Sequence, residues 1–437
     1  MQTWQTVAIQ IVPDAPLQLG TESTLSNYER TAAVISGAVL RGAVAEAALA
    51  SCTQSRRERA DHSTCPDRET CPFWQIFNPA NEPLWGFAYP APLGPAWPFP
   101  LTARTCKREP GYPHRDRWGR TTGHNVYDAL IGQLVDNLLT DPNFPHRADI
   151  LPQLKTDLAT VKGLLRTTCP DCGEPLKPPV GYYAWDARQG PLYAGRASVR
   201  RATHVGINRA RGVAEDSLLF TQESLDMAQD ALFFHTHIRV PAAVWPHLQP
   251  YLDNREYTIG RGRSRGNGRV HILGDVIPTP EIADRVGRFS QAVDNALLRH
   301  KDDDARVQPT PGTFFTLTLR SPTILEHFGQ PRARLEPEDL GLPDARLLRA
   351  WARTEVIGGW DSAARLPRAT CLAIQAGSVF VYWTPAPNDD AALLARLAEL
   401  EMTGVGAERP RGYGHVTVCA PFHTWNRLDL QERSKTL

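Results

Sequence analysis

The chain contains two versions of one sequence, and the first reads Ile259-Gly-Arg-Gly-Arg-Ser-Arg-Gly-Asn-Gly-Arg-Val-His-Ile272. The second version, Val405-Gly-Ala-Glu-Arg-Pro-Arg-Gly-Tyr-Gly-His-Val-Thr-Val418, aligns with the first without gaps. The identical positions are Gly260/Gly406, Arg263/Arg409, Arg265/Arg411, Gly266/Gly412, Gly268/Gly414 and Val270/Val416. A repeat of this kind indicates a duplicated supersecondary unit.

The surroundings of the two copies match as well. An apolar run that contains Phe234 or Phe380 lies 26 residues before the first glycine of each copy. Each half of the chain also opens with a strand-like run and closes with a helix, a Gly/Arg loop and a strand. This order predicts an α+β protein of two tandem ferredoxin-like βαββαβ domains, residues 1–280 and 281–437. Periodicity predicts strands at 7–12, 204–209, 231–240 and 314–322, helices at 35–49, 125–139, 150–165, 241–252, 281–300 and 389–400, and a turn-like connector at 218–225.

The first domain is interrupted by a long segment of different composition, residues 51–191. Much of it is rich in Pro, Cys, Trp and charged residues without sustained periodicity, which predicts a loop-rich insertion.

Composition limits the classes of function. The formal net charge of the 437 residues is only +1, so any nucleic-acid surface must be a local patch. No apolar run approaches the roughly 20 residues that cross a bilayer, and the N-terminus lacks the features of a signal peptide. We therefore expect a cytoplasmic protein, in which the eight cysteines are thiols or metal ligands.

The repeated loop has the chemistry of an anion site. Closely spaced glycines let the backbone approach a ligand, and arginines bind phosphate oxygens. The loop therefore predicts a phosphodiester cradle, although a tight turn with solvated arginines is the alternative. A nucleotide-binding metabolic protein is less favoured, because neither copy has the G-K-[ST] ending of a P-loop or the strand–GxGxxG–helix context.

The cysteines predict a structural zinc site. Cys169 and Cys172 form a CxxC knuckle, which places two thiolates on one tetrahedral metal. Cys106 is the expected third ligand, and Cys65 or Cys71 completes the set. A second site built from Cys52, Cys65, Cys71 and His62 is also possible, whereas Cys371 and Cys419 lie in strand-like runs typical of buried thiols.

Four passages resemble the RAMP superfamily of CRISPR-associated RNA-binding proteins. They are Val34–Ala43, His204–Arg209 with Leu218–Phe220, Ile259–Ile272, and the run from Gly358 to Gly414. The last passage is similar to the large two-domain subunit of type III-D effectors, the Csx-ten family. Ser36 departs from the pattern, because a proline is usual there.

The resemblance implies a non-catalytic subunit of a type III effector ribonucleoprotein in antiviral defence. Such a subunit holds the 5′ handle of the CRISPR RNA (crRNA) and contacts the other RAMP backbone subunits, the large subunit and, through the complex, target RNA. Single-stranded RNA is held by phosphate contacts and by stacked bases. The expected RNA-binding residues are Arg41, Gly260, Arg261, Gly262, Arg263, Arg265, Gly266, Gly268, Arg409, Arg411, Gly412, Tyr413 and Gly414. Tyr413 and Trp360 are the candidates for stacking.

The alternative function is a crRNA-processing endoribonuclease that works without a metal. Related enzymes use a histidine near the first helix, but residues 35–49 contain none. His271 and His415 flank the two loops and are the remaining candidates to contact a scissile phosphate.

Overall fold

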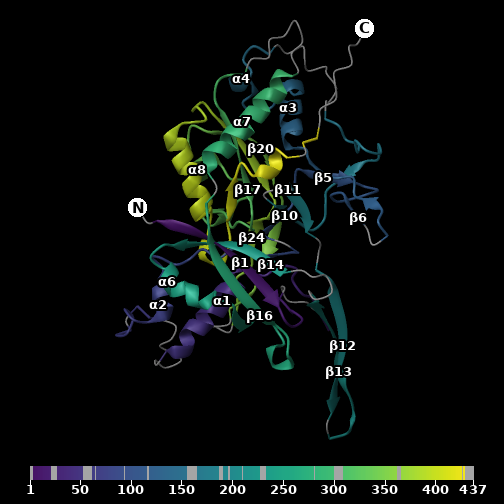
Figure 1. Ribbon diagram of the computed structural model, residues 1–437, viewed down its shortest axis with the longest axis vertical. Coiled ribbons are helices and arrows are strands. Elements are labelled where there is room, and N and C mark those ends of the chain that lie inside the picture. The colour runs from purple at the N-terminus through teal and green to yellow at the C-terminus, as the bar shows by residue number, and fades with distance from the viewer. Residues whose placement is uncertain are drawn as a thin grey trace.

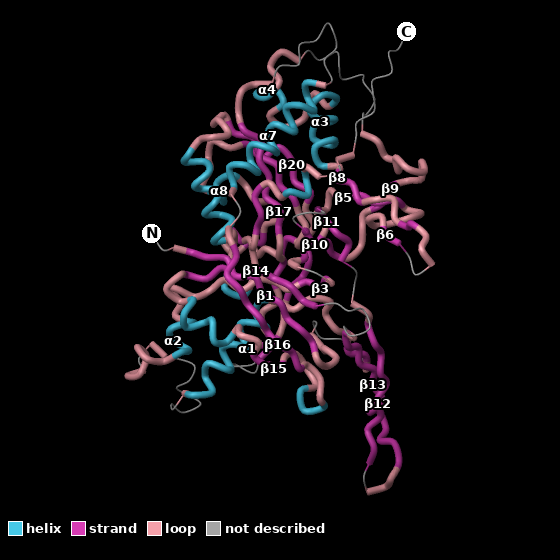
Figure 2. Tube along the Cα trace, in the orientation of Figure 1, coloured by secondary structure: helices cyan, strands magenta, loops and turns pink. Residues whose placement is uncertain are grey.

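The computed structural model describes residues 3–20, 27–52, 62–63, 65–92, 94–115, 118–154, 165–186, 190–194, 197–208, 210–226, 233–279, 281–299, 309–361, 366–425 and 427–428. It is an α+β protein with several antiparallel sheets (Figures 1 and 2). The helices are α1 Gly37–Ala48, α2 Pro72–Phe77, α3 Leu130–Thr140, α4 Arg147–Ile150, α6 Trp245–Leu248, α7 Ile282–Leu298 and α8 Ala391–Thr403.

The sheet of the N-terminal half has the order β15-β16-β1-β14-β3. Its strands are β1 Trp4–Pro13, β3 Tyr89–Ala91, β14 Phe233–Pro241, β15 Arg255–Thr258 and β16 Arg269–Ile277. Alternate side chains of β1 are buried, among them Val7, Ile9 and Ile11, and they pack in one core with the alanine-rich helix α1. Alternation of this kind places the apolar face of a strand on the core and leaves the other face for polar side chains.

The sheet of the C-terminal half has the order β20-β25-β17-β26. Its strands are β17 Thr313–Leu319, β20 Arg346–Trp351, β25 Val379–Thr384 and β26 Val416–Val418. Strands β17 and β25 are buried at every position, because helices α3, α7 and α8 contribute to one core with this sheet. Figure 1 shows α7 and α8 beside β17 and β20.

The segment 51–191 is less separate than its composition predicts. Its strand β3 is an edge of the N-terminal sheet, and its helix α3 packs in the core of the C-terminal half. A buried chain of hydrogen bonds joins the segment to that half: His423 Nδ1 lies 2.8 Å from Asp128 Oδ2, and His423 Nε2 lies 2.7 Å from Thr318 Oγ1. The segment therefore stabilises both halves.

Residues 218–225 form a strand, so the prediction of a turn-like connector is wrong. They belong to β13 Val213–Leu225, which pairs with β12 Val199–Asn208 in a long hairpin that projects from the molecule (Figure 1). Strand β2 Tyr28–Glu29 pairs with β13 at the base of the hairpin. Polar and charged residues fill much of these strands, and such strands are hard to tell from loops by periodicity alone.

Other expected elements have shifted bounds. The helix expected at 125–139 begins only at Leu130, after strand β8 Val126–Asp128, and most of the one expected at 150–165 lies outside the described residues. The helix expected at 241–252 is the single turn of α6 followed by the 3₁₀ turn Gln249–Tyr251. No helix in the described ranges is long and apolar enough to cross a membrane.

The remaining strands are β4 Ala96–Pro98, β5 Ala103–Cys106, β6 His114–Arg115, β7 Thr121–Thr122, β9 Leu176–Lys177, β10 Tyr182–Asp186, β11 Gly190–Ala194, β18 Glu326–His327, β19 Gln330–Pro331, β21 Thr354–Ile357, β22 Trp360–Asp361, β23 Leu366–Pro367 and β24 Cys371–Ile374.

Candidate nucleic-acid interface and metal centre

The two Gly/Arg loops have the same backbone conformation. In loop 1 (residues 259–268) the left-handed positions are Gly260, Gly262, Gly266 and Gly268, with φ of +77°, +71°, +83° and +86°. In loop 2 (residues 405–414) they are Gly406, Glu408, Gly412 and Gly414, with φ of +77°, +56°, +98° and +76°. A 3₁₀ turn, Arg263–Arg265 or Arg409–Arg411, lies between the second and third of these positions. Glycine is favoured here because L side chains avoid positive φ.

The amide groups of both loops are largely satisfied inside the protein. The N–H groups of Arg261 and Gly268 donate to the carbonyls of Gln18 and Pro16, at 2.8 and 3.0 Å. The corresponding N–H groups of loop 2, those of Ala407 and Gly414, donate to Ile324 and Pro322. The glycines therefore allow each loop to pack closely against the segment that follows the first strand of its half. What the loops can offer a ligand is mainly their arginine side chains.

The arginines of loop 1 are exposed. Arg263 Nη1 lies 3.0 Å from Glu46 Oε2 at the surface of α1. The guanidinium carbon of Arg265 lies 6.0 Å from the centre of the Phe220 ring on β13. Arg261 lies across the backbone of Gly20. Loop 1 therefore presents three exposed guanidinium groups, and that of Arg265 lies beside the hairpin.

Loop 2 lies at the interface between the two halves of the chain, the seam between them. A Cβ atom on Gly412 would lie 2.5 Å from the carbonyl oxygen of Trp85, so the loop packs directly on the N-terminal half. Arg411 pairs with Glu408 at 2.6 Å, and Arg409 donates to the carbonyl of Thr403. The structure thus brings Gly412 into packing between the halves, whereas Arg411 is partly exposed and Arg409 is exposed.

The predicted stacking residues differ in exposure. Tyr413 is only 8% exposed and packs edge-on against Phe87 with a ring separation of 5.4 Å, so its ring is not presented to a base. Trp360 is 58% exposed on β22. Arg41 forms an ion pair with Glu82, and its guanidinium lies 5.3 Å from the Phe77 ring.

Four side chains form a candidate metal centre: Cys106, His124, Cys169 and Cys172, with one ligand atom each and all four atoms within 4.8 Å of one another. The small sheet β8-β5-β9 gathers them. Cys106 ends β5, His124 precedes β8, and the knuckle precedes β9. The knuckle turns through Gly173, whose N–H donates to the carbonyl of Cys169 at 2.9 Å and whose φ is +75°.

The donor set fits zinc. The sulfurs of Cys106 and Cys172 are 3.5 Å apart, and Cys169 Sγ lies 3.7 Å from His124 Nδ1. Thiolates at about 2.3 Å from one tetrahedral zinc are separated by about 3.8 Å. Burial opposes ionisation of the Cys106 thiol, but backbone N–H groups of Glu109 and Arg108 and the neighbouring ligands lower its pKa to about 7. Burial raises the pKa of Cys169 to about 11. A bound zinc would hold both thiols as thiolates.

His124, rather than Cys65 or Cys71, completes this group. Cys71 lies instead beside His62, with 3.6 Å between Cys71 Sγ and His62 Nδ1, close to helix α2. His62, His114 and His124 all lie near these cysteines in the sequence, and no feature of the sequence distinguishes one of them as a ligand. The selection comes from the pairing of β5 with β8, which lies far from the α2 region. Cys371 is partly exposed, and the Cys419 thiol is buried with its pKa raised to about 12.

The two histidines beside the loops have different environments. His271 Nε2 lies 3.0 Å from Asp14 Oδ2, and both side chains are about one-third exposed, at 32% and 36%. Burial and the nearby Arg239 lower the pKa of His415 to about 3, and its buried Nε2 has no hydrogen-bond partner among the described residues. The Nε2 atom of His415 is therefore not accessible to a scissile phosphate in this arrangement.

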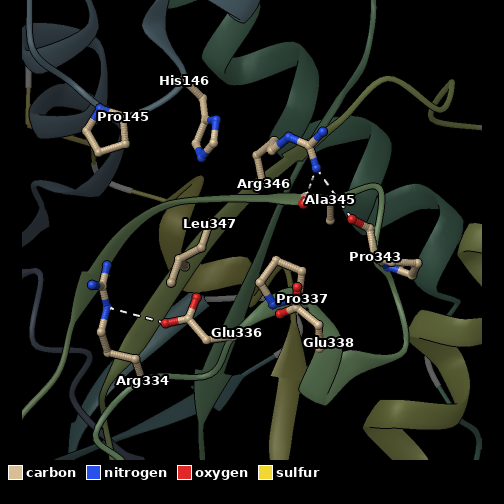
Figure 3. Close-up of a pocket in the computed structure, with 10 residues that line it drawn as sticks. All are labelled: Pro145, His146, Arg334, Glu336, Pro337, Glu338, Pro343, Ala345, Arg346 and Leu347. Carbon is tan, nitrogen blue, oxygen red and sulfur yellow. Dashed lines mark hydrogen bonds and ion pairs between the residues drawn. The ribbon is translucent and has the colours of Figure 1, made fainter.

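A surface hollow of about 450 Å³ is lined by Pro145 and His146 of the segment 51–191 and by residues 334–347 of the C-terminal half. Figure 3 shows Arg334 pointing toward Glu336 and Arg346 toward backbone carbonyls of Pro343 and Ala345. His146, at its rim, pairs with Asp149 at 3.3 Å. The basic groups of the hollow are thus already engaged within the protein.

Comparison with known proteins gives one sequence match. Residues 292–420 match the family model described as CRISPR-associated protein (Cas_Cmr3), whereas no curated protein matches the chain. Among solved structures, it is similar to a chain of the type III-B Cmr-beta complex bound to cognate target RNA, at 10% identity over 86% of both chains with a TM-score of 0.37. It is also similar to Thermus thermophilus Cas6, at 12% identity over 43% of this chain and 74% of that chain, with a TM-score of 0.23. These TM-scores are too low to support an argument about this chain. Residues 292–420, which include loop 2, carry the sequence pattern of the Cmr3 family of CRISPR-associated proteins.

Proposed function

We propose that the chain is an RNA-binding subunit of a type III CRISPR effector complex and holds the 5′ handle of the CRISPR RNA. The match of residues 292–420 to the Cmr3 family carries this proposal. The matched stretch contains one copy of the repeat, and the other copy presents the exposed arginines. The strand orders β3-β14-β1-β16 and β20-β25-β17-β26 correspond to each other and support two ferredoxin-like units. We also propose that the chain belongs to the Csx-ten family of type III-D effector subunits. Its proposed partners are the neighbouring RAMP subunits and the large subunit of the complex.

Loop 1 is the proposed phosphate-binding element. The ion pair between Arg263 and Glu46 joins side chains that are 46% and 68% exposed. Such a surface pair contributes little, roughly 0–1 kcal/mol, so Arg263 can exchange Glu46 for an RNA phosphate at small cost. The zinc centre has a structural part in this proposal, because it ties together β5, β8 and the knuckle within the segment 51–191.

Binding to single-stranded CRISPR repeat RNA tests the proposal. We expect the purified chain to bind the repeat RNA more tightly than a scrambled RNA of equal length, with affinity that falls as salt rises. The RNA should be intact on a denaturing gel. Equal affinity for both RNAs would contradict recognition of the handle, and no affinity for either would contradict an RNA-binding role for the isolated chain.

One observation favours an alternative function, a metal-independent endoribonuclease. His271 and Asp14 form an accessible pair close to the exit of loop 1, and a carboxylate that orients a histidine is a common arrangement for a general base. Nδ1 of His271 lies 3.3 Å from the carbonyl oxygen of Asn254, so a substrate would have to displace this contact. Cleavage of repeat RNA in EDTA that is lost in His271→Ala would favour this alternative.

A further inference from the structure

The hairpin β12–β13 places two rings side by side near loop 1. His204 and Phe220 are direct cross-strand partners, with ring centres 5.3 Å apart and planes inclined by 26°. His204 is exposed and Phe220 is half-buried. The guanidinium of Arg265 lies over the Phe220 ring at 6.0 Å. Three planar groups from two different elements thus meet on one face of the hairpin.

The position of this cluster is fixed by shared anchors. Loop 1 donates to the carbonyls of Pro16 and Gln18, and Leu17 between them pairs with Leu225 at the end of β13. Within the hairpin, the hydroxyls of Thr203 and Thr221 are 3.1 Å apart and hold the register next to the two rings. The loop and the hairpin are therefore held against one another by the same short segment.

We propose that His204, Phe220 and Arg265 form a stacking platform for an unpaired RNA base. Exposed aromatic faces bind bases of single-stranded nucleic acid, and a guanidinium plane adds to the stack. Arg261 and Arg263 lie on the same loop as Arg265 and are placed to hold the phosphates that flank the base. This inference rests on the proposed RNA-binding function and names where the base lies.

The hairpin supplies a matched control on its other face. Leu219 is the neighbour of Phe220 and pairs with Val205, and both are about half exposed, at 57% and 48%. Because side chains alternate across a strand, Leu219→Ala removes a similar exposed apolar group without altering the platform. Phe220→Leu keeps apolar bulk and removes only the aromatic face.

The experiment measures the affinity of the full chain for single-stranded repeat RNA that carries 2-aminopurine, across a series of salt concentrations. We expect Phe220→Ala and Phe220→Leu to weaken binding about 5- to 150-fold, the equivalent of about 1–3 kcal/mol per stacked base. The slope of log affinity against log salt should not change in these variants, because no charge is removed. Leu219→Ala should bind like the wild type, and 2-aminopurine quenching should decrease only in the Phe220 variants.

The outcomes separate this inference from the proposed function. Wild-type affinity in Phe220→Ala, together with weak binding in Arg263→Ala, would overturn the platform and leave the RNA-binding function standing. Equal losses in Phe220→Ala and Leu219→Ala would also overturn it, because the effect would then belong to the hairpin as a whole. Absence of RNA binding by the wild type would overturn both.

Discussion

Gly37 and Gly412 pack backbone against backbone, so that a Cβ atom on Gly37 would lie 2.9 Å from the Cα atom of Gly412. Gly37 begins α1 in the N-terminal half, and Gly412 belongs to loop 2 in the C-terminal half. This contact explains why two copies of one loop have different surroundings. Loop 2 closes the seam between the halves, whereas a Cβ atom on Gly266, the equivalent residue of loop 1, would meet no atom of the described residues within 4 Å.

The two equivalent glycines should respond differently to alanine. Both have positive φ, +98° in Gly412 and +83° in Gly266, so alanine costs about 1–2 kcal/mol at either. At position 412 the new methyl group also meets the Trp85 carbonyl, and overpacking adds about 1–3 kcal/mol. Urea unfolding should therefore show a larger loss of stability for Gly412→Ala than for Gly266→Ala, and equal losses would contradict the packing role of loop 2.

The zinc centre should depend on His124 and not on Cys65. Elemental analysis of the wild type should show stoichiometric zinc, which we assign to Cys106, His124, Cys169 and Cys172. We expect Cys169→Ser and His124→Ala to lose this zinc and to melt at a lower temperature, because metal binding contributes folding free energy. Cys65→Ser is the matched control and should keep it. Loss of this zinc in Cys65→Ser but not in His124→Ala would restore the ligand set that the sequence suggested.

Stability should fall in mild acid. Burial lowers the pKa of His235 to about 4 and that of both His237 and His415 to about 3, from an ordinary value of 6.5. Below pH 6.5 the unfolded chain binds protons that the folded chain does not, so the free energy of unfolding decreases as pH falls toward 4. Each histidine contributes up to about 1.4 kcal/mol per pH unit. Urea midpoints at pH 7.5 and 5 should be closer together in His415→Gln, whereas substitution of the exposed His327 should leave their separation unchanged.

The arginines of the two loops should contribute differently to RNA binding. Arg263→Ala with Arg265→Ala should reduce the slope of log affinity against log salt by at least about 0.7, the contribution on a single strand of the one phosphate contact proposed for Arg263. Arg411→Ala in loop 2 should leave the slope nearly unchanged, because Arg411 is paired with Glu408 and only one-third exposed. An identical slope in the first variant and the wild type would remove loop 1 from the phosphate-binding surface.

Cleavage by this chain should be absent if it is a guide-holding subunit. Repeat RNA should stay intact on denaturing gels with the wild type and with His271→Ala, in EDTA as well as in Mg²⁺. Product bands that disappear in His271→Ala, with RNA affinity maintained, would instead assign the His271–Asp14 pair to catalysis.

Features that depend on local spacing could be predicted from the amino-acid sequence. Glycines at 260, 266 and 268 and at their repeats specify left-handed backbone, and these positions have nearly equal φ in the two loops. The knuckle of Cys169 and Cys172 likewise brings two ligands together through one short turn. Hydrophobic periodicity located α1, α7, α8 and the buried strands, because a continuous apolar face must pack against a core.

What packs against each of the two similar loops follows from the tertiary fold. Helix α1 packs on Gly412 of loop 2 through Gly37, whereas the equivalent Gly266 of loop 1 meets no described atom within 4 Å and the arginines of loop 1 are exposed. The pairing of β5 with β8 also places His124, rather than Cys65 or Cys71, beside Cys106, and the contact between the halves buries Tyr413 and the Nε2 atom of His415. These outcomes rest on contacts between residues far apart in the chain, where burial and charge depend on what packs opposite, and a local pattern does not contain that information.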